Sequence, residues 1–472
     1  MVDATVLSLT DGVRVVVPDS LDLITPYVLR EQLDFFEDEL RFVRRLLQAG
    51  QKVIDIGANY GVYTLPMARK IGATGHVWAF EPTSDTAGFL ARGIAANGFG
   101  QVTLVREAVS STSGTARLVL EHHSEGNSID HGDTPVAASE MVPLVSLDEC
   151  MDRYQWVDIE LVKIDAEGEE CNIVKGGRRF FSELAPLVQY ELRKGAGNVN
   201  LQLIQDFAAL GYESYRLVPG LNVLAPLNID ATRDPYLLNL FCCKPRRGDA
   251  LAAQGLLLRS SDVSGAAVSL EQHTPASADP HWQRAWALPY AVPFASRWRE
   301  SEASGGSAEI IRALALYSRS RDSEVPLANR FCALEASVSI LRTLCAREPV
   351  RLRFASLARA AHDFGERATS VIALKSLLTH IHENGVDVSE PFLAPLERFD
   401  SIVPDAEPAR WLVAAVLEQL EHREWFSSFY AGPNARERLD DIHALGLGSA
   451  EMSRRLDLVR RRFGGERSTG GV

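Results

Sequence analysis

The stretch that decides the fold is Val53-Ile-Asp-Ile-Gly-Ala-Asn-Tyr-Gly-Val-Tyr-Thr64, in a chain of 472 residues. It predicts an apolar strand that runs into a turn containing Gly57 and Gly61, with a helix starting directly after it. Gly57 allows a turn that a Cβ atom resists and a close approach of a ligand to the backbone. Asp55, at the carboxyl end of the strand, can meet an ammonium group or order water beside one. That chemistry suits a cofactor with a free amino group better than a pyrophosphate.

A second acidic residue ends the next predicted strand, Val77-Trp-Ala-Phe-Glu81-Pro82, 26 residues after Asp55. An acid at this position can accept hydrogen bonds from both hydroxyls of a ribose. The dinucleotide-binding alternative requires Gly-x-Gly-x-x-Gly, whereas this chain has Asp-x-Gly-x-Asn-x-Gly. The pair of motifs therefore favours a nucleoside cofactor other than a dinucleotide.

Short apolar runs alternate with helical or Gly-rich stretches from about residue 10 to residue 246. After a predicted helix over Pro26–Leu47, five runs predict a parallel sheet covered on both faces. They are Lys52–Ile56, His76–Phe80, Val102–Val105, Glu160–Ile164 and Leu187–Leu192. A helix over Leu201–Leu210 follows, and three further runs predict an antiparallel edge: Tyr212–Leu217, Asn222–Leu224 and Leu238–Cys243.

Residues 30–225 resemble the FkbM family of methyltransferases. Besides the two motifs above, the resemblance includes Glu107-Ala-Val-Ser110, Gly126-Asn-Ser128, Leu144-Val-Ser-Leu-Asp148, Val162-Lys-Ile-Asp-Ala-Glu-Gly-Glu-Glu170 and Gly176-Gly177. It implies a Rossmann-like class I methyltransferase sheet, S-adenosylmethionine as cofactor, and methylation of a hydroxyl group. The cofactor-binding residues predicted on this basis are Asp55, Gly57, Asn59, Gly61, Glu81, Glu107 and Ala108.

Three carboxylates are candidates for catalysis: Asp165, Glu167 and Glu191 follow or end neighbouring predicted strands. The carboxyl ends of such strands line one crevice. A buried carboxylate with a raised pKa could remove the proton of an attacking alcohol, and Asp165 is the preferred base. The alternative is a divalent metal held by these oxygens, as in catechol-type O-methyltransferases. It is not favoured, because Leu192-Arg-Lys194 follows Glu191 where an asparagine is expected, so no metal ligand is assigned.

Charge and composition limit the partners. A net charge of −13 argues against general binding to nucleic acid. No stretch approaches the roughly 20 apolar residues that span a bilayer, and no secretion signal is recognised. The six cysteines are scattered without a metal-binding spacing, so we expect reduced thiols and a cytoplasmic protein.

The predicted domains are a methyltransferase domain over 1–246, a partly ordered linker over 247–306, an all-helical domain over 307–465, and a disordered tail over 466–472. Two predicted helices of the third region, Leu334–Leu344 and Arg367–Leu378, match at an offset of 34 residues. This indicates tetratricopeptide-like helical pairs or a plain bundle, either of which could bind a protein partner.

The function expected from the whole sequence is O-methylation of a hydroxyl on a sugar, glycan or natural product. Methylation of a protein side chain is the first alternative, because the cofactor motifs do not report the acceptor. The second alternative is a helical partner-binding protein that uses the N-terminal half as a cofactor-binding scaffold.

Overall fold

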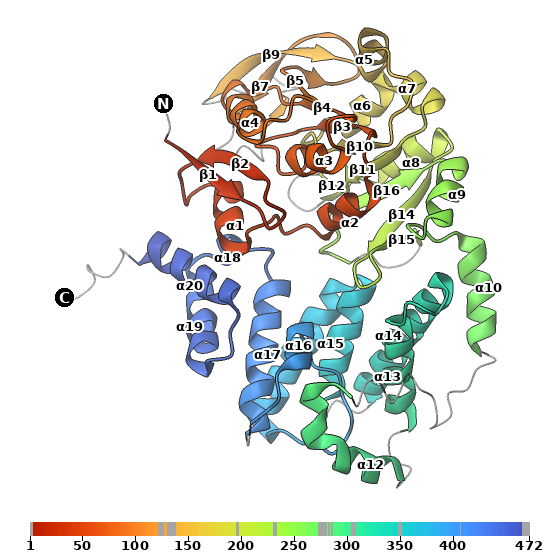
Figure 1. The fold of residues 1–472 in the computed structure, drawn as a ribbon, viewed down its shortest axis with the longest axis vertical. Helices are drawn as coiled ribbons and strands as arrows, with labels where there is room; N and C mark the ends of the chain where they lie inside the picture. The colour runs from red at the N-terminus through yellow and green to blue at the C-terminus, as the bar shows by residue number, and fades with distance from the viewer. Residues whose placement is uncertain are drawn as a thin grey trace. The chain divides into compact units, whose positions relative to one another are not determined.

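The computed structural model describes residues 3–120, 127–129, 138–194, 198–229, 234–271, 281, 284, 287–303, 308–347, 352–405 and 407–464. The chain divides into two compact units (Figure 1). Unit 1 comprises Met1–Leu217, Leu224–Ala231 and Leu237–Leu257, and unit 2 comprises Val218–Val223, Thr232–Tyr236 and Leu258–Val472.

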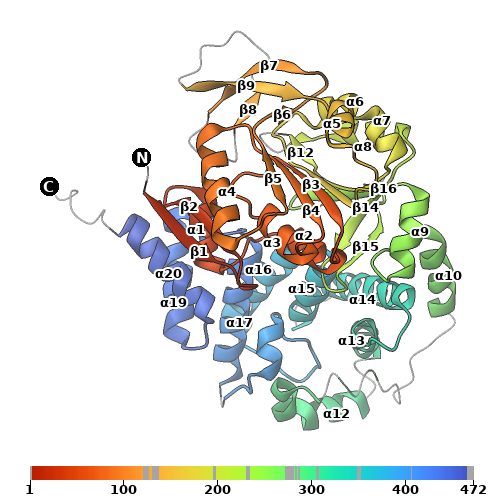
Figure 2. The same cartoon turned by 45° about the horizontal axis from the view of Figure 1, so that its top comes forward.

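Unit 1 is built on an eight-stranded sheet with the order β15-β14-β16-β11-β10-β3-β4-β5. Figure 2 shows β3, β4 and β5 of this sheet side by side. Its parallel strands are β3 (Lys52–Ile56), β4 (His76–Phe80), β5 (Val102–Val105), β10 (Leu161–Ile164) and β11 (Leu187–Glu191). β16 (Asn239–Cys243) runs antiparallel between β11 and β14 (Glu213–Val218), and β15 (Val223–Pro226) forms the edge. The predicted Rossmann-like methyltransferase sheet with an antiparallel edge is confirmed.

Both faces of this sheet are covered, which explains why its strands are apolar throughout. Ile54, Ile56 and Phe80 pack into one core cluster, whereas Val53 and Val77 pack into another on the opposite face. The covering helices are α1 (Ile24–Gln32), α2 (Asp38–Leu46), α3 (Thr64–Ile71), α4 (Ser84–Asn97), α5 (Leu147–Tyr154), α6 (Glu170–Gly176), α7 (Arg178–Glu183), α8 (Leu201–Ala209) and α9 (Pro245–Ala253). Because side chains alternate along a strand, Asp55 lies on the same face as Val53.

Small sheets accompany the main one. A hairpin joins β1 (Ala4–Ser8) to β2 (Arg14–Pro18). A four-stranded sheet contains β6 (Ala108–Val109), β7 (Gly114–Val119), β8 (Ser128–Ile129) and β9 (Ser139–Val145). A short pair joins β12 (Arg193–Lys194) to β13 (Asn198–Val199).

The prediction of one helix over Pro26–Leu47 is wrong, because the chain breaks between α1 and α2. Leu33 takes a left-handed conformation, with φ at 59°, and ends α1. The Asp34 carboxylate then accepts a hydrogen bond from the Phe35 backbone amide. It also forms a bidentate interaction with the Arg44 guanidinium, at 2.7 and 2.9 Å. The break places Glu37 at the first position before α2.

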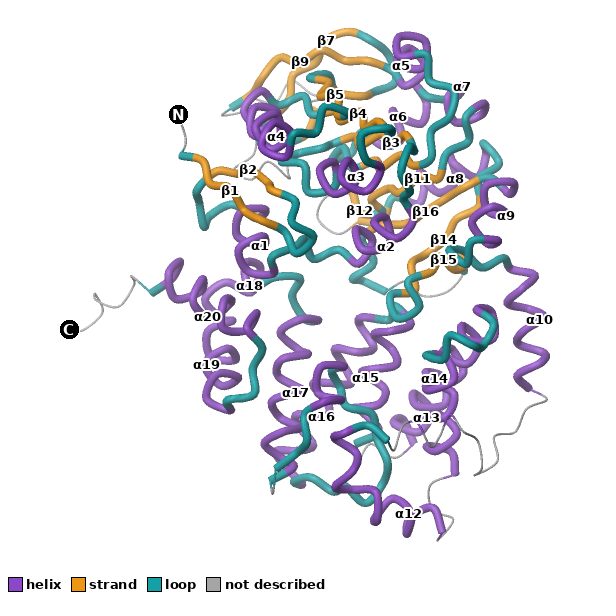
Figure 3. The backbone as a smooth tube through the Cα atoms, in the orientation of Figure 1, coloured by secondary structure: helices purple, strands orange, loops and turns teal. Residues whose placement is uncertain are grey.

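From Leu258 onward, unit 2 is helical wherever regular structure is described (Figure 3). Its elements are α10 (Ser260–Glu271), η2 (Pro289–Phe294), α12 (Ala295–Ala303), α13 (Ala308–Ser320), α14 (Leu327–Arg347), α15 (Arg353–Phe364), α16 (Arg367–Asn384), η3 (Glu397–Ser401), α17 (Pro408–Arg423), α18 (Ser428–Ala431), η4 (Gly432–Asn434), α19 (Ala435–Leu445) and α20 (Ala450–Phe463). The expected all-α region is thus observed, whereas the tetratricopeptide-like pairing stays a prediction.

The predicted domain boundaries stay predictions, and the residues around them show two notable features. The described parts of 247–306 include α10, η2 and α12, and Trp298 is only 1% exposed. Trp282 and Trp286 lie outside the described residues. Asp234 belongs to unit 2. Its carboxylate accepts a hydrogen bond at 2.7 Å from the backbone amide of Ala368, which lies in the first turn of α16.

Among the helices that the structure describes, none has the length and hydrophobicity needed to cross a bilayer.

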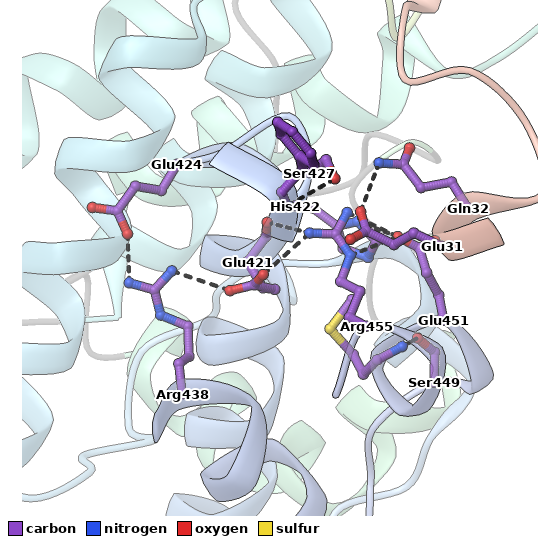
Figure 4. Close-up of polar contacts among 12 residues, drawn as sticks. Glu31, Gln32, Glu421, His422, Glu424, Ser427, Arg438, Ser449, Glu451 and Arg455 are labelled. Carbon is purple, nitrogen blue, oxygen red and sulfur yellow. Dashed lines mark hydrogen bonds and ion pairs between the residues drawn. The ribbon is translucent and has the colours of Figure 1, made fainter. Parts of the chain in front are cut away.

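A buried arginine ties α20 to α17. Arg455 is 1% exposed and donates to the Glu421 carboxylate at 3.2 Å and to its backbone carbonyl at 3.0 Å (Figure 4). Its Nε atom donates to Glu451 at 3.1 Å. Glu421 is itself fully buried, so its charge depends on Arg455 and on Arg438, which donates to its other carboxylate oxygen at 3.5 Å.

We therefore expect Arg455→Met to destabilise unit 2. Removing one partner of a buried ion pair typically costs about 3–5 kcal/mol, which corresponds here to roughly 10 °C in Tm. Thermal unfolding followed by circular dichroism measures this loss. Arg461→Met is the matched control, because Arg461 is exposed on the same helix and should change stability by less than about 0.5 kcal/mol. Equal Tm values for the two variants would show that the buried pair contributes nothing.

Candidate active site

Three central strands place polar side chains in register on one face of the sheet. Lys163 pairs with Asp55 on one side and with Gln189 on the other. All three residues are buried, at 4%, 0% and 0% exposure respectively. Two residues further along, the same strands lead to Gly57, Asp165 and Glu191. The face therefore carries a buried polar row and, just beyond it, the candidate catalytic carboxylates.

The turn after β3 is tightly constrained. Gly57 has φ at +78°, and a Cβ atom added there would lie 1.7 Å from the Asp165 carbonyl oxygen. Gly61 also has a positive φ, at +88°. Asn59 between them is left-handed, with φ at 48°. The glycine at position 57 is therefore required by the approach of β10 as well as by the turn.

Asp55 lies beneath this turn rather than at its surface. Its Oδ2 atom accepts a hydrogen bond from the Thr64 hydroxyl at 2.5 Å. Its Oδ1 atom is buried without a hydrogen-bond partner among the described residues. Burial raises the pKa of Asp55, although Lys163 and Thr64 oppose the shift.

Glu81 lies at the carboxyl end of β4, where it binds two backbone amides. The Asn59 amide donates to Oε2 and the Thr83 amide to Oε1, each at 2.9 Å. Burial raises the pKa of Glu81 to about 7, because desolvation outweighs these hydrogen bonds. Asn127, from the Gly126-Asn-Ser128 motif, donates to the Thr83 hydroxyl at 3.4 Å. Each carboxylate oxygen keeps a lone pair that can accept from a ribose hydroxyl.

Asp165, Glu167 and Glu191 come together. Each offers a carboxylate oxygen, and these oxygens all lie within 4.8 Å of one another. Such a set could hold a divalent cation, since hard cations take oxygen ligands. Asn239 lies directly opposite Glu191 in the register of β16. An asparagine is therefore present beside Glu191, on a neighbouring strand that is distant in sequence.

The clustering changes the chemistry of Glu191. Burial raises its pKa to about 9, and the nearby negative charges of Asp165 and Glu167 add to the effect. Like charges this close cannot all ionise freely. A proton or a cation bound to the cluster would relieve this repulsion near neutral pH.

The loop that presents Glu167 is held by the acids that follow it. The Glu170 carboxylate accepts hydrogen bonds from the backbone amides of Ala166 and Gly168, at 3.2 and 3.1 Å. Glu169 accepts a hydrogen bond from the Ser110 hydroxyl at 2.8 Å. Two motifs quoted from the sequence, 107–110 and 162–170, thus contact each other directly.

Two predicted cofactor residues lie in different surroundings. Glu107 forms an ion pair with Arg153 on α5. The Ala108 side chain is buried in β6, in the core of the four-stranded sheet. Their assignment to the cofactor stays a prediction.

Five residues of this region were not singled out from the sequence: Glu37, Tyr63, Lys163, Gln189 and Asn239. Lys163 and Gln189 could have been found from the strand pattern, since they precede Asp165 and Glu191 by two residues and so share their face. Glu37 carried no such signal, because the predicted helix continued through it.

These residues fit S-adenosylmethionine as a nucleoside carrying an amino acid. Glu81 supplies a buried acceptor for ribose hydroxyls, with the glycine turn beside it. The excess of carboxylates around Asp55 and Asp165 suits a cationic ligand.

Part of this chain is similar to known methyltransferases. Residues 55–214 match the methyltransferase FkbM domain. Methyltransferase FkbM from Methylobacillus flagellatus KT is 17% identical, and the match covers 42% of this chain and 44% of that one, with a TM-score of 0.29. Trm5b from Pyrococcus abyssi is 11% identical, covering 51% of this chain and 55% of that one, with a TM-score of 0.29.

A S-adenosylmethionine-dependent O-methyltransferase from Thermotoga maritima is 13% identical; the match covers 51% of this chain and 77% of that one, with a TM-score of 0.25. The chain spans about half the length of the first two structures. No curated protein matches the sequence. Residues 55–214 form a methyltransferase FkbM domain, built on the Rossmann-like sheet of unit 1.

Proposed function

We propose that this protein methylates a hydroxyl group of a sugar, glycan or natural product, with S-adenosylmethionine as cofactor. The observation that carries the proposal is the convergence of Asp165, Glu167 and Glu191 beside the glycine turn of β3. The cofactor, when bound, supplies an electrophilic methyl group. The residues of the chain bind and orient the two reactants and accept a proton.

Glu81 and the turn form the proposed cofactor side. Glu81 accepts the ribose hydroxyls, and the Asn59 and Thr83 amides keep its carboxylate in place. Gly57 and Gly61 allow the left-handed turn that brings the Asn59 amide to Glu81.

The three carboxylates form the proposed acceptor side. Asp165 is fixed, because Lys163 donates to its Oδ2 atom at 2.8 Å, which leaves Oδ1 to accept from a substrate hydroxyl. Glu191 is better suited than Asp165 to remove the proton, because its raised pKa makes its ionised form a stronger base. Glu167 is exposed at the tip of its loop, where it can meet the acceptor.

A hydroxyl acceptor suits this site because carboxylates only accept hydrogen bonds, and sugar hydroxyls can donate several. The resemblance to FkbM proteins points the same way. A protein side chain is the alternative acceptor. A screen with labelled S-adenosylmethionine against glycans, glycolipids and peptides separates the two.

The helical unit is proposed to recruit the acceptor or a protein partner. Stacked helices offer extended surfaces for such binding. If the protein binds S-adenosylmethionine but transfers no methyl group to any acceptor, a partner-binding role built on a cofactor scaffold becomes the better account.

The base assignment predicts a specific pH dependence. Glu191 is protonated below its pKa of about 9, so kcat/KM should rise about tenfold per pH unit up to that value. Glu191→Gln should remove this rise and lower kcat at least ~10²-fold, while affinity for S-adenosylhomocysteine changes little. Initial rates of labelled methyl transfer measure both. Glu183→Gln, an exposed acid at the end of α7, is the control. A wild-type pH profile in the Glu191 variant would exclude Glu191 as the base.

A divalent cation could occupy the same three carboxylates instead of a proton. With Glu191 as the base we expect turnover to survive treatment with EDTA. Turnover is measured before and after chelation, and again after Mg²⁺ is added back. Loss in EDTA with recovery in Mg²⁺ would replace the base with a metal and would assign Asp165, Glu167 and Glu191 as its ligands.

A further inference from the structure

Lys163 is a buried ammonium that neither binds a reactant nor accepts the proton in the proposed reaction. It lies in the middle of β10, and its in-register neighbours are Asp55 on β3 and Gln189 on β11. The residue is 4% exposed. A lysine is almost never buried to this degree unless its charge is paired.

Its contacts lead directly to the carboxylate cluster. The Nζ atom donates to the Asp165 Oδ2 atom at 2.8 Å and lies 4.8 Å from the centre of the Tyr63 ring. The Tyr63 hydroxyl donates a hydrogen bond to the Glu37 carboxylate at 2.5 Å and accepts one from the side-chain amide of Gln189 at 3.0 Å. The lysine therefore connects the exposed end of the sheet to a buried polar group below it.

The charges around Lys163 are unequal, because one ammonium faces three carboxylates. Burial alone would lower the pKa of Lys163, but Asp165, Asp55 and Glu37 together raise it above its ordinary value. The lysine stays charged as a result. It is the cation that opposes the raised pKa of the fully buried Asp55 and of the partly buried Glu37.

We propose that Lys163 is a positioning residue, whose ammonium holds the Asp165 carboxylate beside Glu167 and Glu191 for methyl transfer. The role of Asp165 in catalysis rests on the proposed function; the Lys163–Asp165 link rests on the contacts alone. Stability does not by itself require a lysine here. An apolar side chain of similar volume often replaces a buried ion pair without loss when both charges are removed.

A double-mutant cycle tests the link without using activity. Lys163→Met and Asp165→Asn are made singly and together, and Tm is measured for each. We expect Lys163→Met to lower Tm by about 10 °C, because it leaves buried carboxylates without their cation. The loss in the double variant should be smaller than the sum of the two single losses, by about 5 °C or more. Additive losses would overturn the proposal.

Lys175→Met with Asp165→Asn is the matched cycle, since Lys175 is an exposed lysine on α6 and should give additive shifts. If Lys163→Met fails to fold, Lys163→Gln replaces it in the double-mutant cycle, because glutamine removes the charge and keeps a hydrogen-bond donor.

Kinetics and cofactor binding test the positioning role. Lys163→Met should bind S-adenosylhomocysteine within about threefold of the wild type, as measured by calorimetry, and lose about 10²-fold in kcat with little change in KM. An unchanged kcat would overturn the role in catalysis. If the wild type transfers no methyl group, the proposed function fails, and the thermal cycle still decides whether Lys163 holds Asp165.

Discussion

The close approach of β10 to the turn after β3 is the constraint on which the site depends. A side chain at position 57 would lie 1.7 Å from the Asp165 carbonyl oxygen, so the two strand ends can meet only over glycine. Their meeting brings Asp165 beside the turn that presents the Asn59 amide to Glu81. β11 pairs in parallel with the other edge of β10, so that Asp165 and Glu191 share one end of the sheet. The contact at Gly57 therefore brings Asp165 to the proposed cofactor side, and the pairing of β10 with β11 adds Glu191.

The second constraint is electrostatic. Burying Asp55, Glu37 and Glu191 near one another is unfavourable, because desolvation and mutual repulsion both penalise their ionised forms. The protein offsets this with one buried ammonium at Lys163 and with hydrogen bonds from the Thr64 hydroxyl to Asp55 and from the Tyr63 hydroxyl to Glu37, and the raised pKa of Glu191 favours its protonated form. A cationic ligand would relieve the same repulsion. The clustered carboxylates make burial of the site unfavourable. The same negative charge suits the site to a sulfonium cofactor and to proton removal.

The sheet was predictable from sequence because its strands are short apolar runs, each ended by a chemically distinctive residue such as Asp55 or Glu81. Their bounds agree with β3, β4 and β5 to the residue. The single helix over Pro26–Leu47 was wrong because its apolar periodicity continues through Leu33, where the chain turns left-handed. The grouping of Asp165, Glu167 and Glu191 followed from strand order. Strand alternation also places Lys163 on the face of Asp165, but the local sequence does not show that Asp55 lies opposite Lys163 on the neighbouring strand. Asn239 was missed for the same reason: β16 lies next to β11 in space and far from it in sequence.

The measurement that tests the central claim most directly is calorimetric titration of the purified protein with S-adenosylhomocysteine, beside a Glu81→Gln variant. Glu81 has a pKa of about 7 and accepts hydrogen bonds best when ionised, so wild-type affinity should fall about tenfold from pH 8 to pH 6. The variant should bind weakly and without this pH dependence. Equal affinity of the two proteins at both pH values, or no binding by a folded wild type, would contradict the assignment of this site to the cofactor.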